Sequence, residues 1–436
     1  MCMHGKEVKV ISNCVNDLIE NLKVSTCSYT TVLNALKQLE QNDFECLEMG
    51  KKWYIEKGGR YVINIHDSSL VAFTVGDEGT LKIGCAHTDH PCLYVKPHPE
   101  MIAEGHYGRI NTEVYGGPIL NTWMDRPLSI AGRVALRSSD VYNPEIRIID
   151  VEKPVLTIPN VAIHLNRDVN KGIELNKQVD LIPLAGFSDE DEEISKDFFL
   201  DFLQDYLMRD KNDILDYELY VYNCDTPLVT GMNGEMLSSP RLDNITSVNS
   251  LVKGICKSNC GNGIHVIALF DNEEIGSRTK QGADSSTLSM ILEKIYISLG
   301  YTRDEYIDYI SEGYMISLDV AHGHHPNRPE KTDPTNKCYL GKGIVIKRAA
   351  SQTYATDCQV TAIVEQLCDR YDIPYQKYAV RSDGTTGSTL GTIAGKYIPM
   401  RSIDVGVPVL AMHSSRELMS TKDQYSLDRF VEAFFK

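Results

Sequence analysis

The amino-acid sequence predicts an α/β protein with a mixed sheet flanked by helices and with an inserted β-rich domain. Two stretches of the chain alternate amphipathic helical segments with short apolar strands, as α/β sheets do. The stretch between them has β-type segments and scattered Gly and Pro instead. A chain of 436 residues is long enough for two such domains.

The first α/β stretch opens with a predicted helix over 28–40, "SYTTVLNALKQLE". Val32, Ala35 and Leu39 share one face of this helix, and Ser28 is a candidate N-cap. Three predicted strands follow, separated by the turn signals "KGG" and "GDEG": 61–65, 69–75 and 81–87.

The second α/β stretch starts near residue 240. A helical segment, a strand, a second helical segment and a second strand follow one another, at 244–255, 264–270, 285–300 and 313–319. Shorter strands are predicted at 378–380 and 401–406.

The intervening stretch carries β-type segments such as "LSIAGRVAL" and "PEIRIIDV". Its acidic run at 189–193 is expected to be a solvated loop or helix face. We therefore predict a discontinuous domain over 1–97 and 232–436, with an inserted domain over 98–231.

The composition excludes several classes of protein. The net charge of −16 disfavours a nucleic-acid partner, because phosphates would be repelled. No stretch approaches the roughly twenty consecutive apolar residues of a membrane span, and the first thirty residues lack the features of a signal peptide. Scattered cysteines without an export signal are typical of a cytoplasmic protein, and the pair Cys256 and Cys260 has no second pair to complete a zinc ribbon. We expect a cytoplasmic protein with no nucleic-acid or membrane partner.

Polar residues stand at the ends of predicted strands, where open α/β sheets place their sites. After the strand 81–87, "HTDH" sets His87 two positions before Asp89. A carboxylate at that spacing can hold the second ring nitrogen of a metal-binding His. The competing interpretation is a capped strand end with a surface His.

Three further segments repeat this placement. "PRLDN" sets Asp243 before a helical stretch, where an N-cap is the competing role. "AMHSSREL" offers His413 after the apolar "VPVL". "SLDVAHGHHPN" ends a strand with Asp319 and adds three histidines that form either a metal site of their own or a wall of a larger one: His322, His324 and His325.

The segment "ALFDNEEIGS" ends an apolar strand with two adjacent glutamates, Glu273 and Glu274. Two imidazoles and three carboxylates from these segments suit a pair of divalent ions bridged by one carboxylate and a water. One glutamate then ligates an ion, and the other accepts the proton of the water. The residues alone leave open which glutamate does which.

Other chemistries have weaker support. "GTTGSTLG" at 384–391 has the composition of an anion-binding loop but lacks the Lys of a P-loop, and an ordinary tight turn competes with that role. The chain contains no G-x-S-x-G nucleophile elbow.

Five ordered segments of the chain are similar to the signatures of the aspartyl aminopeptidase family of metallopeptidases. They are "HTDHPCLYVKP", "RLDN", "DNEEIGS", "DVAHGHHPN" and "PVLAMHSSRE". The resemblance implies an enzyme that removes the N-terminal residue of peptides through attack of a metal-bridged hydroxide. It implies two divalent metal ions per subunit, zinc first, with manganese or cobalt as alternatives.

The resemblance also implies an architecture. The parts 1–97 and 232–436 would form the catalytic domain, and 98–231 would be a dimerisation domain. Dimers would assemble into a tetrahedral dodecamer.

The roles of the site residues follow from the resemblance, motif by motif. His87 and Asp319 would bind one ion, and Glu274 and His413 the other, with Asp243 bridging the two.

Four other residues receive supporting roles from the same resemblance. Glu273 would be the general base, and Asp89 would orient His87. His164 would reach the active site of a neighbouring subunit, with a structural His as the alternative. Lys347 would pair with an acidic side chain of the substrate, with a solvated surface charge as the alternative.

The first residue removed is expected to be acidic, Asp or Glu, and a neutral or apolar residue is the alternative, because the family includes both kinds. Two other functions compete: a metal-dependent amidohydrolase or carboxypeptidase acting on acylated amino acids, and a catalytically silent assembly protein. The position of "RLDN" after the insertion disfavours the first, and the complete ligand set disfavours the second.

Overall fold

The computed structural model describes residues 2–172, 174–188, 193–258, 261–384 and 387–436. Most of the acidic run at 189–193 therefore lies outside the described residues, as do Cys260 and two positions of the loop at 384–391. The chain folds as two compact units. The first comprises Met1–Asp89, Pro227–Met412 and Glu417–Lys436, and the second comprises His90–Thr226 and His413–Arg416.

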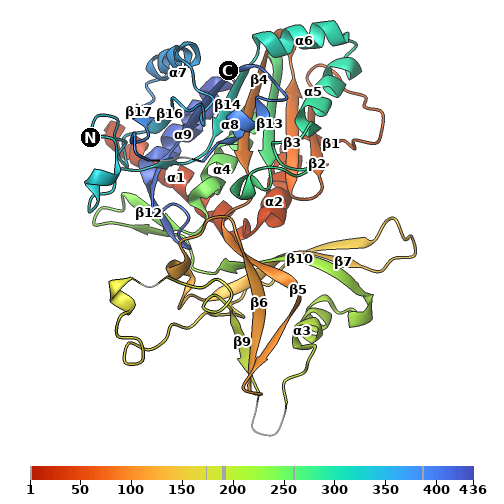
Figure 1. Ribbon diagram of the computed structural model, residues 1–436. Helices are drawn as coiled ribbons and strands as arrows, with labels where there is room; N and C mark the ends of the chain where they lie inside the picture. The colour runs from red at the N-terminus through yellow and green to blue at the C-terminus, as the bar shows by residue number, and fades with distance from the viewer. Residues whose placement is uncertain (1, 173, 189–192, 259–260, 385–386) are drawn as a thin grey trace. The chain divides into compact units, whose positions relative to one another are not determined.

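The first unit is built on a nine-stranded mixed sheet (Figure 1). Its four central strands, β13, β4, β14 and β18, run parallel to one another. Across the sheet the order is β1 (Glu45–Cys46), β2 (Arg60–Ile65), β3 (Ser69–Val75), β13 (Asn262–Phe270), β4 (Asp77–His87), β14 (Tyr314–Leu318), β18 (Arg401–Gly406), β16 (Ile344–Arg348) and β17 (Tyr375–Ala379).

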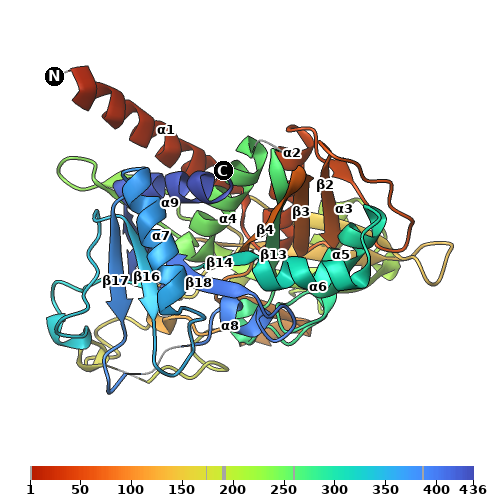
Figure 2. The same ribbon diagram turned by 90° about the horizontal axis from the view of Figure 1, so that it is seen from above.

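Helices cover both faces of this sheet (Figure 2). One face packs against α1 (Cys2–Val24), α2 (Ser28–Glu40), α4 (Leu242–Lys257), α7 (Cys358–Arg370) and α9 (Thr421–Phe434). The other packs against α5 (Thr287–Ser298), α6 (Arg303–Glu312) and α8 (Leu390–Ala394). Side chains alternate along β13: Ile267 and Leu269 enter the first core, whereas Val266 and Ala268 enter the second.

A five-stranded sheet completes the first unit. Its order is β11 (Leu228–Thr230), β12 (Met236–Ser239), β20 (Glu417–Ser420), β19 (Pro408–Leu410) and β15 (Ala321–His322). The short 3-10 helices η4 (Glu273–Ile275) and η5 (Pro329–Lys331) also belong to this unit.

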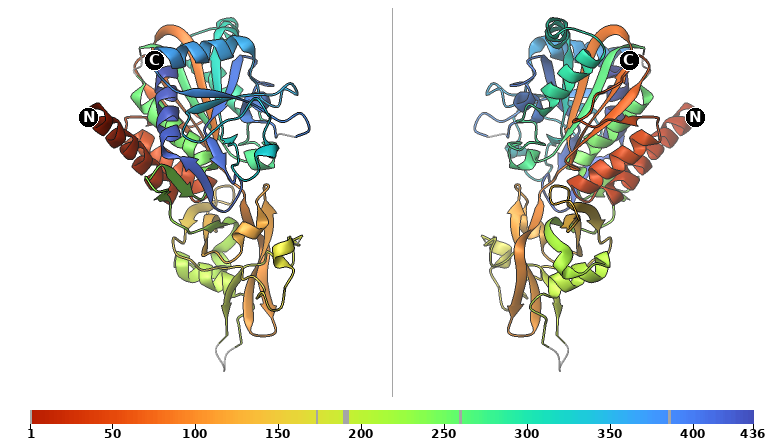
Figure 3. Two further views of the ribbon diagram at one scale, coloured as in Figure 1. Left: turned by 90° about the vertical axis from the view of Figure 1, so that its left-hand side faces the viewer. Right: turned by 90° about the vertical axis from the view of Figure 1, so that its right-hand side faces the viewer.

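The second unit is β-rich. Its six-stranded antiparallel sheet has the order β8 (Glu145–Asp150), β7 (Leu128–Leu136), β10 (Ile214–Asn223), β5 (Cys92–Ala103), β6 (Tyr107–Tyr115) and β9 (Leu184–Phe187). Figure 3 shows β5 and β6 as a long antiparallel ribbon, coloured orange. The helices of this unit are η1 (Leu120–Trp123), η2 (Val169–Lys171), α3 (Phe198–Leu207) and η3 (Lys211–Asp213).

The predicted fold class is confirmed, because a mixed sheet is flanked by helices on both faces. The predicted helix over 28–40 and the strand over 69–75 have the bounds of α2 and β3. The predicted N-cap is wrong. Cys27 occupies that position with an extended backbone, and its N–H donates to Thr30 Oγ1 over 2.9 Å, while Ser28 is already the first helical residue.

Close packing of α4 on the sheet depends on Gly84 of β4. A Cβ atom at this position would collide with the Leu251 side chain of α4. Leu251 itself has no exposed surface, and complete burial of a leucine side chain contributes about 1.5–3 kcal/mol. This contact fixes α4, and with it Asp243, over β4.

Among the described residues, no helix is long and apolar enough to cross a membrane. The cysteines whose side chains the structure describes are free thiols, Cys85 and Cys92 among them.

His265, near the start of β13, makes the fold sensitive to acid. Its side chain is 3% exposed, and its Nδ1 lies 2.6 Å from Ser258 Oγ. Burial, aided by the ammonium of Lys82, lowers the pKa of His265 to about 4 from its ordinary value of 6.5. As the pH falls below 6.5, the unfolded chain takes up this proton and the folded chain does not. The free energy of unfolding therefore falls between pH 6.5 and pH 4.

We expect His265→Gln to remove this part of the acid sensitivity. Between pH 7 and pH 4 the unmodified protein should lose about 2–3 kcal/mol more of its free energy of unfolding than the variant does. Urea unfolding of both proteins at the two pH values measures the difference. Equal losses would show that the folded state binds this proton as readily as the unfolded chain.

Candidate active site

The candidate residues lie at one edge of the nine-stranded sheet. His87 is the last residue of β4, Asp319 follows the end of β14, and Glu273 and Glu274 lie just after β13. Because β13, β4 and β14 are parallel neighbours, their carboxyl ends meet at the same edge. The sheet thus brings together side chains that are far apart in the sequence.

His87 lies at the centre of this cluster and is 1% exposed. Its Nε2 is 3.2 Å from Asp243 Oδ1 and 3.6 Å from Asp319 Oδ1. Its Nδ1 is 3.0 Å from the backbone carbonyl oxygen of Asp89, and this contact orients the ring. Burial alone would lower the pKa of His87, but hydrogen bonds to Asp243, Asp319 and Asp89 raise it well above its ordinary value.

Asp243 reaches the cluster from the first turn of α4, where the backbone departs from helical geometry. The residue at the N-cap is Arg241, so the competing role for Asp243 as an N-cap is wrong. Its N–H donates to Glu417 Oε2 over 3.0 Å, and the Asn244 side chain donates to the Leu318 carbonyl over 2.8 Å. These two bonds hold the start of α4 against β20 and β14.

A tight turn aims both glutamates at the cluster. β13 ends at Phe270, the chain turns through Asn272 at a φ of 62°, and Glu273 and Glu274 form the short helix η4. Adjacent residues on an extended strand would point to opposite faces, whereas in this turn both carboxylates lie near His87.

The carboxylate of Asp89 holds this turn. Its Oδ1 accepts the Glu273 N–H and its Oδ2 accepts the Glu274 N–H, both over 3.1 Å. The same carboxylate lies 3.5 Å from His87 Nδ1, farther than the backbone carbonyl oxygen of Asp89. Asp89 therefore orients His87 mainly through its backbone and the two glutamates through its side chain.

We expect Asp89→Asn to disorder the turn of the two glutamates. An amide offers one oxygen in place of two, so one of the two N–H groups would face an NH₂ donor. For the peptidase activity that the family resemblance implies, kcat should fall about 10–100-fold, as for other groups that support metal ligands. Steady-state kinetics together with metal analysis tests this prediction. An unchanged kcat would show that the turn keeps its conformation without the Asp89 carboxylate.

Glu273 is crowded by other ionisable side chains. Burial, reinforced by the negative charges of Asp319, Asp89 and Asp243, raises the pKa of Glu273 to about 8, although His87 opposes the rise. A carboxyl group whose pKa lies near neutrality is suited to accept and return a proton.

Lys347 of β16 is buried, with 1% of its surface exposed. Its Nζ donates to Asp319 Oδ2 over 3.1 Å. The alternative of a solvated surface charge is therefore wrong for Lys347, although it holds for its exposed neighbour Arg348. The side chain that Lys347 meets is a candidate metal ligand.

Two candidate residues belong to the second unit. His413 lies in the short segment His413–Arg416, and its Nδ1 is 3.1 Å from the Gly117 carbonyl oxygen. When Nδ1 carries the proton of that hydrogen bond, Nε2 is left as the acceptor, as in metal-bound imidazoles. His164 is exposed, in an irregular segment between β8 and β9.

The three histidines after Asp319 have different surroundings. His324 Nδ1 lies 3.1 Å from Thr332 Oγ1, whereas His322 and His325 line a cavity of about 550 Å³ in the first unit. Among the described residues none of the three belongs to a group that could hold a metal ion, which favours their role as a wall over a site of their own.

The cluster fits divalent cations by the chemistry of its donors. Ligand atoms of His87, Asp243 and Asp319 lie within 4.8 Å of one another, and so do those of His87, Glu273 and Glu274. Crowded carboxylates repel one another unless cations lie between them, and a mixed set of oxygen and imidazole ligands suits zinc, manganese or cobalt. No local sequence pattern marks Glu417 as the partner of Asp243, so this contact could not be predicted.

A histidine with several carboxylates at the carboxyl edge of a mixed α/β sheet is typical of metal-dependent hydrolases. The model of the aminopeptidase I zinc metalloprotease family, M18, matches residues 21–435. A Clostridium novyi protein named "Probable M18 family aminopeptidase 2" is 43% identical over 96% of this chain and 98% of its own length. A Pseudomonas savastanoi pv. phaseolicola protein of the same name is 37% identical over 96% of this chain and 97% of its own. The chain therefore belongs to the M18 family, and it is a metal-dependent aminopeptidase.

Solved structures agree with this fold. The cryo-EM structure of the Ape4 and Nbr1 complex matches with a TM-score of 0.93 at 30% identity, over 98% of this chain and 86% of that chain. The crystal structure of the M18 aminopeptidase from Thermotoga maritima matches with a TM-score of 0.87 at 21% identity, over 98% and 97%. The S. cerevisiae mApe1 dodecamer matches with a TM-score of 0.81 at 23% identity, over 96% and 95%.

Proposed function

We propose that the chain is a dinuclear metalloaminopeptidase that releases acidic N-terminal residues from peptides. The observation that carries the proposal is the cluster of donors at the sheet edge, where ligand atoms of His87, Asp243 and Asp319 lie within 4.8 Å of one another and those of Glu273 and Glu274 lie near His87. His87 and Asp319 would hold one ion, Glu274 and His413 would hold the other, and Asp243 would be a ligand of both. Zinc is the expected metal, and manganese and cobalt are the alternatives.

When bound, the two ions would supply a water of lowered pKa and positive charge that stabilises the developing oxyanion. Glu273 accepts the proton of the attacking water and passes it to the leaving amine. Asp89 keeps Glu273 in place through the backbone of the η4 turn. His164 is proposed to contact the substrate in a neighbouring subunit.

The preference for an acidic first residue has support in the cavity that His322 lines. Lys331 and Arg381 bring positive charge to this cavity beside the carboxylates of Glu330 and Asp383, and Arg381 donates two hydrogen bonds to Asp383, at 2.6 and 2.8 Å. A side-chain carboxylate of the substrate would compete with Asp383 for the guanidinium.

A second candidate is an aminopeptidase that prefers neutral or apolar first residues. The same cavity is lined by Val380, Val409, Leu410 and Met412, which would accept an apolar side chain.

Peptides that differ only in the first residue decide between the two candidates. Purified protein loaded with Zn²⁺, Mn²⁺ or Co²⁺ is incubated with Asp-, Glu- and Leu-initiated versions of one peptide, and kcat/KM is measured for each. A higher kcat/KM for Asp and Glu supports the first candidate, and a higher value for Leu supports the second. Release of no residue by any metal form contradicts both.

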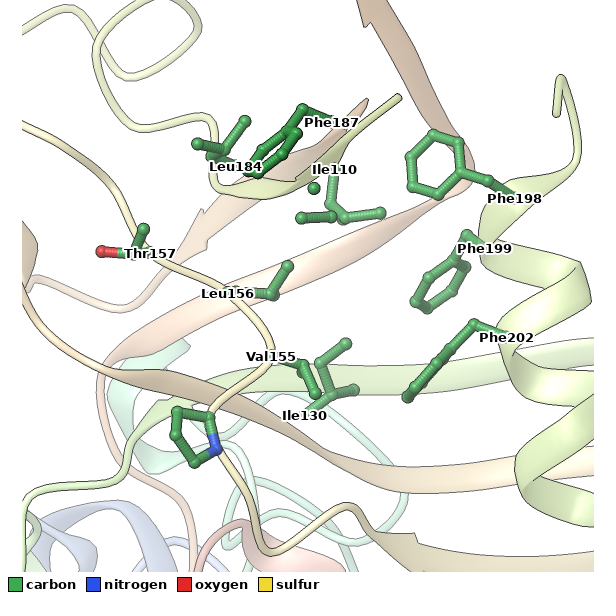
Figure 4. A pocket seen from close by; sticks show the side chains of 13 residues that line it. Ile110, Ile130, Val155, Leu156, Thr157, Leu184, Phe187, Phe198, Phe199 and Phe202 are labelled. Atoms are coloured by element: carbon green, nitrogen blue, oxygen red, sulfur yellow. The ribbon is translucent and has the colours of Figure 1, made fainter. Parts of the chain in front are cut away.

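The second unit is proposed to be a dimerisation domain within a tetrahedral dodecamer. It contains a cavity of about 640 Å³ whose lining residues carry no charged side chain (Figure 4). Phe198, Phe199 and Phe202 project toward it from α3, and Phe187 of β9 is 68% exposed. Such apolar surface supports contact with another copy of the chain. Light scattering by the purified protein should give a particle mass twelve times the chain mass of 48.9 kDa.

The free thiols support the proposed location in the cytoplasm.

A further inference from the structure

His413 lies in a loop whose conformation depends on the second unit. Residues 411–416 join β19 to β20, two antiparallel strands of the five-stranded sheet, yet His413–Arg416 belongs to the second unit. The backbone of His413 has a φ of 66°, in the left-handed region, which a residue with a Cβ atom seldom occupies unless its surroundings fix it. The contacts of this segment therefore decide how the imidazole is presented.

The residues that precede η1 hold His413 itself. The Ile119 N–H donates to the carbonyl oxygen of His413 over 2.9 Å. The Nδ1 of the ring lies 3.1 Å from the Gly117 carbonyl oxygen, and this contact leaves Nε2 as the acceptor for an ion. Both the backbone and the ring of His413 are thus fixed by one short stretch of the second unit.

Thr122 of η1 links these contacts to the rest of the segment. Its hydroxyl donates to the Ile119 carbonyl oxygen over 2.6 Å and accepts the Ser415 N–H over 2.9 Å. Its own carbonyl oxygen accepts the Ser415 hydroxyl. Ser415 is 3% exposed, so water has little access to replace these partners. One side chain therefore fixes both the turn that binds His413 and the residue two positions after it.

The end of the segment is held separately, by the end of β10 and the residues that follow it. Asn223 Nδ2 donates to the Ser415 carbonyl oxygen over 2.9 Å, and Arg416 Nη2 donates to the Thr226 carbonyl oxygen over 2.9 Å. Because these bonds do not involve Thr122, loss of the Thr122 hydroxyl should loosen the segment without releasing it.

We propose that Thr122 is a positioning residue for His413. Through Ile119 and Ser415, its hydroxyl holds the segment that presents the imidazole to a metal ion. The inserted unit then sets the conformation of a metal ligand in addition to its proposed role in assembly. This inference rests on the proposed function, because it takes His413 as a ligand. Thr122 itself contacts neither the ion nor the substrate.

The zinc affinity of the purified protein tests this role independently of activity. Thr122→Val keeps the shape of the side chain but removes the hydroxyl. Competition with a chromophoric chelator should show that one of the two Zn²⁺ ions binds this variant about 10–100-fold more weakly. Thr122→Ser retains the hydroxyl and should bind both ions as the unmodified protein does.

Thr112→Val is the matched control. It makes the same chemical change in β6 of the same unit, where the buried Thr112 hydroxyl donates to the Leu181 carbonyl oxygen over 3.3 Å. Both zinc affinities should stay unchanged in this variant. Ser415→Ala removes a single bond to Thr122, so it should weaken the same ion as Thr122→Val by a smaller factor. Circular dichroism verifies that each variant is folded.

A double variant tests whether Thr122 acts through His413. His413→Ala removes the proposed ligand and should weaken the same ion at least as much as Thr122→Val does. Thr122→Val combined with His413→Ala should then bind zinc no more weakly than His413→Ala alone, because the two residues act on one contact. Losses that add, as for independent sites, would overturn the proposal.

The outcomes distinguish this inference from the proposed function. Weaker zinc binding in His413→Ala with unchanged binding in Thr122→Val would overturn the positioning role and leave His413 as a ligand. Unchanged zinc binding in His413→Ala would contradict both. The expected zinc affinities in a protein that releases no residue from Asp-, Glu- or Leu-initiated peptides would support the positioning role while contradicting the proposed function.

Discussion

Glu273→Gln is expected to lower kcat for release of the first residue by about 10²–10⁴-fold while the protein keeps both metal ions. The amide has nearly the shape of the carboxylate, so the η4 turn and its bonds to Asp89 persist. It cannot accept the proton of the attacking water, and the loss should therefore appear in kcat more than in KM. Steady-state kinetics and elemental analysis of the same sample measure both properties.

The adjacent residue provides a matched control. Glu274→Gln makes the same chemical change in the same turn, but it removes a proposed ligand and should reduce the bound metal. If the two variants lost metal and activity to the same extent, the assignment of Glu273 as the general base and Glu274 as a metal ligand would be wrong.

Asp243→Asn is expected to be the most damaging change to metal binding. As the bridging ligand, Asp243 contributes to both ions, and the metal content should fall from two ions per chain to one or none. Loss of an ion removes several kcal/mol of stabilisation of the transition state, so kcat should fall about 10³-fold or more.

Thermal unfolding with and without added Zn²⁺ provides an independent measure for this variant. Ions that bind only the folded state stabilise it by about 2.7 kcal/mol at one hundred times their Kd. The increase in Tm produced by Zn²⁺ should therefore be smaller for Asp243→Asn than for the unmodified protein. An equal increase, with two ions retained, would show that Asp243 does not bridge.

The strand β3 could be predicted because its local pattern is uniform. Every residue of β3 is buried, and turn signals lie on both sides of it, so its bounds follow from the sequence alone. The helix α9 was not predicted, because its inner face is partly polar. Gln424 and Asp428 are buried there and bond Ser250 of α4 over 2.8 and 2.6 Å.

The candidate ligands could be found because each follows an apolar strand or precedes a helix. The side chains that position the candidate ligands could not be predicted, because these contacts join distant parts of the chain. Glu417 binds the Asp243 N–H from 174 positions away, and Lys347 binds Asp319 from 28 positions away. The cap at Cys27 was missed for a related reason. Thr30 reaches back to the backbone of Cys27, a residue type that is not usually a cap.

The central claim is that paired ions and Glu273 release the first residue of a peptide with a free amine. Mass spectrometry of a peptide and its N-acetylated twin, each incubated with zinc-loaded protein, tests this claim most directly. We predict that the first residue is released from the free-amine peptide alone, that a chelator stops the reaction, and that added Zn²⁺ restores it. Cleavage of the acetylated twin alone would identify an amidohydrolase, and cleavage of neither peptide would contradict the claim.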